Sequence, residues 1–135
     1  MEIRSIELPG SEVESVVIEG DDLILRFSRA YIIKTISGSE ERTKWWQAGD
    51  LVFEQAEVDG ELPECPAVCS GGDVGENIYT YRDMVQIPLQ EQGQAHCNLW
   101  FEGTEKRLKV RAARVRMRMQ DRPRYIEHIR PNAAD

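Results

Sequence analysis

VVIEGDDLILRF, residues 16–27, is the stretch that decides the fold class. Two apolar runs flank the turn-rich segment Glu19-Gly20-Asp21-Asp22, an arrangement that is typical of a β-hairpin. In the second run Leu23, Leu25 and Phe27 alternate with other residues, so their side chains share one face of an extended strand. The stretch therefore predicts two antiparallel strands joined by a short turn.

The same period-2 alternation recurs outward from this hairpin along most of the 135 residues. No apolar stripe with the period of a helix runs for more than about two turns. The turn signals divide the chain into about eight to ten short strands. We therefore expect one all-β domain over residues 1–135, an antiparallel β-sandwich or a jelly-roll-like barrel, with a polar C-terminal tail from about residue 130.

The alternation fails between Asp59 and Glu76, where proline, glycine and acidic residues dominate. Loops of this length are uncommon in compact domains and often carry function, so we expect one long loop over about residues 59–76. Cys65 and Cys69 lie in it, and two readings of the pair stay open: metal ligands, or a reversible disulfide. Because no second ligand pair accompanies them, we expect free thiols and no metal site.

One strand near the C-terminus changes its pattern halfway. Leu108, Val110 and Ala112 are apolar at even-numbered positions, whereas Val115 and the two methionines after it are apolar at odd-numbered positions. A single inserted residue shifts the faces of a strand in this way. The slip predicts a bulge or sharp bend near Ala112-Ala113.

Six basic side chains project from the polar face of this strand, and we predict a partner surface there: Arg107, Lys109, Arg111, Arg114, Arg116 and Arg118. Same-face neighbours on a strand are about 6.6 Å apart, close to the spacing of phosphates along a nucleic-acid strand. The plainer alternative is a solvated face whose cations pair with carboxylates such as Glu54 or Glu102. Aromatic residues are not interleaved and the net charge is −7, so we expect no nucleic-acid binding.

Three tryptophans support an alternative function. Trp45 and Trp46 are adjacent, so an extended chain turns one of them away from the core, and Trp100 shares a strand face with polar residues. Exposed aromatic rings on β-domains pack against the apolar faces of sugars. Trp45, Trp46 and Trp100 therefore define a candidate small-ligand site, and their chemistry favours a carbohydrate.

Composition and motifs exclude several classes of protein. The chain is 41% hydrophobic and 30% charged, and it contains neither an apolar run of membrane-spanning length nor a basic start followed by the apolar run of a signal peptide. No nucleophile elbow, zinc-protease helix or phosphate-binding loop is present, so we expect no catalytic residues and no cofactor. Three cysteines are an odd and sparse set, which favours reduced thiols in the cytoplasm.

Charge is divided unevenly along the chain. Residues 1–103 contain 7 basic and 20 acidic side chains, whereas residues 104–135 contain 10 basic and 4 acidic ones. A sign asymmetry of this size can mark an interaction surface. The sequence thus predicts a soluble, cytoplasmic, non-enzymatic domain that acts through a protein partner or as a homodimer, away from membranes.

Overall fold

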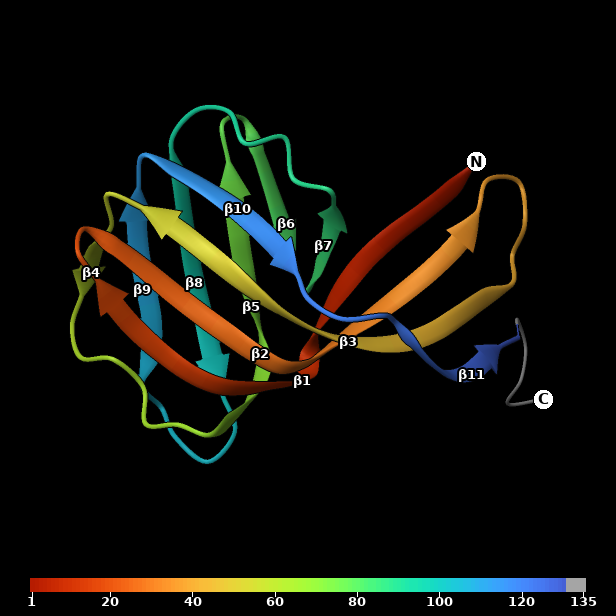
Figure 1. Cartoon of the computed structure of the whole chain (residues 1–135), viewed down its shortest axis with the longest axis horizontal. Helices are drawn as coiled ribbons and strands as arrows, with labels where there is room; N and C mark the ends of the chain where they lie inside the picture. Colours follow the sequence, from red (N-terminus) through yellow and green to blue (C-terminus); the bar gives the residue numbers. More distant parts are fainter. Residues whose placement is uncertain (131–135) are drawn as a thin grey trace.

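The computed structural model describes residues 1–130, which form one antiparallel sheet of 11 strands (Figure 1). The strands are β1 (Glu2–Glu19), β2 (Asp22–Ile36), β3 (Arg42–Glu54), β4 (Glu57–Asp59), β5 (Ala67–Glu76), β6 (Tyr79–Arg82), β7 (Met84–Ile87), β8 (Ala95–Phe101), β9 (Arg107–Ala112), β10 (Arg114–Met119) and β11 (Arg124–Ile129). The all-β prediction is confirmed. With 18, 15 and 13 residues, β1, β2 and β3 are longer than the short strands that we predicted.

The strand order is β10-β3-β2-β1-β5-β8-β9-β4, and β11, β6 and β7 pair with β3, β5 and β1 outside this path. The predicted hairpin is present, with Glu19 opposite Asp22 and Ile18 opposite Leu23. The predicted polar tail lies almost wholly outside the described residues.

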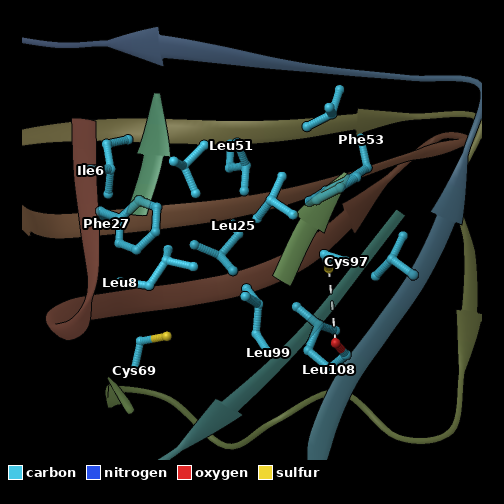
Figure 2. Packing of buried hydrophobic residues seen from close by; sticks show 14 of the residues in the cluster. Ile6, Leu8, Leu25, Phe27, Leu51, Phe53, Cys69, Cys97, Leu99 and Leu108 are labelled. Atoms are coloured by element: carbon cyan, nitrogen blue, oxygen red, sulfur yellow. Dashed lines mark hydrogen bonds between the residues drawn. The ribbon is translucent and has the colours of Figure 1, made fainter. Parts of the chain in front are cut away.

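The sheet folds over, so that its two halves cover the same core (Figure 2). Leu25 and Phe53 reach this core from β2 and β3, and Leu99 and Leu108 reach it from β8 and β9. All four side chains are fully buried. Burial of apolar surface from both halves is the main term that stabilises the fold.

A bulge lets β1 continue through Pro9 and Gly10, which look like strand breakers in the sequence. The register between β1 and β2 shifts between Glu7 and Glu12, where Gly10 has a φ of 90°. The buried hydroxyl of Ser11 donates a hydrogen bond to the Glu7 carbonyl (2.6 Å) and accepts one from the Tyr31 N–H (3.1 Å). These bonds replace the ladder bonds that the bulge removes.

Beyond the bulge a single layer of strands projects from the body, and we call it the arm (Figure 1). It consists of β11 and the outer parts of the three long strands, residues 2–5, 31–36 and 42–47, whereas β7 pairs with β1 but packs Val85 and Ile87 into the core.

The bend predicted at Ala112-Ala113 is confirmed. β9 ends at Ala112 and pairs with β8 and β4, whereas β10 begins at Arg114 and pairs with β3. The chain also bends between β3 and β4, directly beside the bend between β9 and β10. Glu54 lies opposite Arg114 before this bend, and Glu57 lies opposite Arg111 after it. This pair of bent strands connects the two halves of the sheet on the side away from β1.

The predicted long loop over residues 59–76 is wrong in its second part, because residues 67–76 form β5 in the middle of the sheet. The glycines that resemble a loop signal allow a close approach instead. A Cβ on Gly72 would collide with the Asn98 carbonyl and lie 2.8 Å from the Leu99 Cα of β8. Glycine is required where two backbones come this close.

The acidic residues of this segment also have partners that its composition does not reveal. Asp73 accepts two hydrogen bonds from the Arg82 guanidinium, at 2.7 and 2.9 Å. Glu76 is 1% exposed, and its carboxylate accepts hydrogen bonds from the N–H groups of Gln90 and Glu91, at 2.8 and 2.9 Å. A buried carboxylate needs such donors, and here they hold the β7–β8 loop against the sheet.

Candidate interaction surface

The structure divides the six predicted surface cations into two groups of three. In the β10 group, Arg114 and Arg116 both lie beside Glu54 of β3, at 3.9 and 3.2 Å. Glu54 is one of the carboxylates expected to pair with this row. On the same face the Arg116 position lies next to Val52 of β3, which is 1% exposed although it faces away from the core.

Arg118, the third member of the β10 group, belongs to a buried network around Asp50. The Asp50 carboxylate is 1% exposed and lies between Arg26 of β2 (3.1 Å) and Arg118 (3.3 Å). Gln120 donates a further hydrogen bond to it at 3.0 Å. The hydrogen bond to Asp50 raises the pKa of Arg26, which keeps that cation charged. The β10 group therefore joins strands within this chain.

The β9 group, Arg107, Lys109 and Arg111, faces solvent, and we call it the basic row. Arg111 lies 3.6 Å from Glu57, but both side chains are largely exposed, at 83% and 77%. Within residues 1–130, Arg107 and Lys109 have no carboxylate within 4.0 Å. The guanidinium of Arg107 instead lies 5.1 Å from the ring centroid of Trp100.

Three carboxylates, Glu57, Asp59 and Glu61, form an acidic row beside the basic row. Glu57 lies opposite Arg111 and Asp59 opposite Lys109 in the β4–β9 ladder, so each pair projects from the same outer face. Glu61 follows β4 and contacts Lys106 at 3.0 Å. Sequence analysis found the cations but missed this row, although the alternation of Glu57, Asp59 and Glu61 is a signal in the sequence.

The two rows line adjoining hollows of about 390 and 540 Å³ that share Asp59 and Lys109. His96 and Asn98 of β8 form the opposite wall of the smaller hollow. The side-chain oxygen of Asn98 is buried and has no hydrogen-bond partner within the described part of the chain. The surface thus offers cations and carboxylates side by side.

Aromatic rings on β8 are held over glycines of β5 beside this surface. Trp100 lies opposite Gly71 and His96 opposite Gly75, and a Cβ on Gly71 would lie 3.1 Å from the Trp100 indole nitrogen. A ring over a cross-strand glycine covers the exposed backbone. Trp100 is therefore half-buried and also lies against Arg107, which leaves little of its ring free for a sugar.

The three tryptophans of the alternative site do not share a surface. Trp45 and Trp46 point to opposite faces of the arm, as successive strand residues do. Trp45 contacts Tyr125 edge-on, with centroids 5.3 Å apart, and Trp46 lies against Arg29 at 4.4 Å. Trp100 belongs to β8 in the other half of the sheet. The three tryptophans therefore do not line one concave surface that could bind a sugar.

The cysteines are placed for packing. Cys65, Cys69 and Cys97 are free thiols, and the last two are buried. Burial raises the pKa of Cys69 to about 11 and also raises that of Cys97, so both thiols stay protonated. Within residues 1–130 no group of three or more histidine, cysteine or acidic side chains is close enough to hold a metal ion.

Comparison of the chain with models of protein families, with curated proteins and with solved structures finds no match. No helix in residues 1–130 has the length and hydropathy that a membrane span requires.

Proposed function

We propose that this protein has no catalytic activity and acts through contact with another protein chain, made by the outer face of β4 and β9. The observation that supports it is the difference between the two groups of cations. The β10 group contacts carboxylates of its own chain, one of which is fully buried. Arg107 and Lys109, in contrast, have no carboxylate within 4.0 Å among the described residues, and they line the hollows of the surface.

Exposed ion pairs such as Arg111–Glu57 contribute little to the stability of a folded chain. Rows of charge on a surface instead speed the encounter with a partner and select its orientation. The same arrangement disfavours nucleic acid, since carboxylates beside the cations repel a phosphate backbone. A protein surface that presents both signs of charge is the better complement.

Site-specific photo-crosslinking in living cells tests the proposal. A photoreactive amino acid at Lys109 should give an adduct with a discrete protein. The same residue at Arg42, an exposed arm position away from β4 and β9, is the matched control. The proposal fails if Lys109 gives no adduct, or if the two positions give the same adducts in similar yield.

A further inference from the structure

We propose that the partner is a second copy of this chain, bound through the same β4–β9 face about a twofold axis. This inference rests on the proposed function and adds the identity of the partner. It follows from the charges on that face, which form two parallel rows of opposite sign (Figure 1 shows β4 and β9 side by side).

The two rows match in number, and the β4–β9 register aligns two of their three pairs, Glu57 with Arg111 and Asp59 with Lys109, while Glu61 follows β4 and contacts Lys106. Each row has three charges, so the six together carry no net charge. Paired strands lie about 4.8 Å apart, and same-face residues along one strand are about 6.6 Å apart. The register that sets Glu57 beside Arg111 and Asp59 beside Lys109 therefore produces two straight, adjoining stripes.

Such a pair of stripes is complementary to itself. If a second copy is rotated by half a turn about an axis that lies in the contact plane, midway between the rows and parallel to them, its basic row falls on the first copy's acidic row. Its acidic row falls on the first copy's basic row at the same time. Symmetric dimers require a surface of this kind, whereas a face with one sign of charge would repel its own copy.

In the dimer Arg111 and Lys109 each lie beside the carboxylate opposite them in their own chain and also face the corresponding carboxylate of the partner. In the monomer the Arg111–Glu57 pair is exposed to water, which weakens it. Contact removes part of that water from both sides of the pair. The adjoining hollows of 390 and 540 Å³ leave room for the partner's long side chains between the rows. Because charged groups dominate this contact, salt should weaken it.

Sedimentation velocity over a range of concentrations, at about 50 mM and about 1 M salt, tests the inference, since the Debye length shortens several-fold between them. The purified chain should dimerise at low salt and dissociate at high salt. Reversing part of the basic row (Lys109→Glu with Arg111→Glu) should weaken dimerisation by at least about tenfold, because both rows are then acidic. Reversing part of the acidic row (Glu57→Lys with Asp59→Lys) should do the same with the opposite sign.

Two further samples test complementarity itself. A mixture of the two reversed variants should form a heterodimer, since one now presents mainly negative charge and the other mainly positive charge. The variant that combines all four substitutions should regain the homodimer, because two positions in each row have exchanged their charges and each cation again faces a carboxylate of the partner. The control Arg42→Glu with Arg122→Glu changes the net charge as much as the basic-row variant, at exposed positions away from β4 and β9, and should dimerise like the wild type.

The inference is wrong if the wild-type chain is monomeric at every concentration and salt, or if reversing one row leaves the dimer intact. The second result would assign the dimer to another surface, such as the arm. It is also wrong if the reversed variants, each folded by circular dichroism, fail to form a heterodimer. A crosslink from Lys109 to a different protein, with a monomeric purified chain, would refute this inference but support the proposed function.

Discussion

Substitution of Gly72 by alanine tests whether residues 67–76 are a central strand or a loop. Gly72 has a φ of 140°, which side-chain-bearing residues rarely adopt. A Cβ there would collide with the Asn98 carbonyl of β8 and lie 2.8 Å from the Leu99 Cα. Both obstacles are backbone atoms, so no side chain can rotate away. The strand pair itself would have to separate.

The expected loss of stability has two parts. Holding alanine at this φ costs about 1–3 kcal/mol. Forcing β5 and β8 apart in a packed sheet costs about 1–3 kcal/mol more. Together they lower the free energy of unfolding by roughly 2–6 kcal/mol, which corresponds to a fall in Tm of about 7–20 °C for a domain of this size. In a loop with open space, only the backbone strain would remain, about 1 kcal/mol.

Urea unfolding followed by tryptophan fluorescence measures the difference. Gly103→Ala is the matched control, because Gly103 also has a positive φ (78°) but its Cβ would meet nothing within 4 Å. We expect this control to lose about 1 kcal/mol, the strain alone. Equal losses in the two variants would show that β5 and β8 do not approach as described.

Further measurements test three buried or paired groups. Asp50→Asn should cost about 2 kcal/mol, since a buried acceptor of charged donors becomes neutral; an unchanged urea midpoint would contradict the network. A thiol reagent at about pH 8 should modify Cys65 before Cys69, whose pKa is raised to about 11 by burial; simultaneous modification would contradict the burial. The hydrogen bond from Arg82 lowers the pKa of Asp73 in the folded chain. The Asp73–Arg82 pair therefore stabilises the fold above the unfolded pKa of about 3.9, and this stabilisation is lost as the pH falls through the folded pKa. Arg82→Gln should raise that pKa in a carboxyl NMR titration, and no change would contradict the pair.

Local signals in the sequence identify the fold class and the bend. The hairpin at residues 16–27 and the change of face at Ala113 follow from which residues are apolar at alternate positions. These patterns are visible in the sequence because the face of each strand that packs in the core must be apolar.

Features that depend on contacts far along the chain were not predictable. Gly72 resembles a loop residue until β8 is placed against it, and Glu76 resembles a solvated charge until two N–H groups of a later loop reach it. The candidate surface could be predicted only in part, because the pairing of its cations also depends on contacts between distant parts of the chain. The six cations look equivalent in sequence. Only the folded chain shows that Arg114 and Arg116 lie within 4.0 Å of Glu54, while Lys109 has no carboxylate that close among the described residues.

The bent β9–β10 segment has a consequence for the order in which the chain folds during synthesis. Until residues 107–119 leave the ribosome, the ladders that join the two halves within the described residues are those of β1 with β5 and with β7. The edges of β3 and β8 are then open and carry apolar residues such as Phe53 and Leu99. Non-local pairing of this kind is slow and leaves nascent sheets prone to aggregation. A chain that ends before residue 107 therefore lacks both strands of this segment and exposes two unpaired sheet edges.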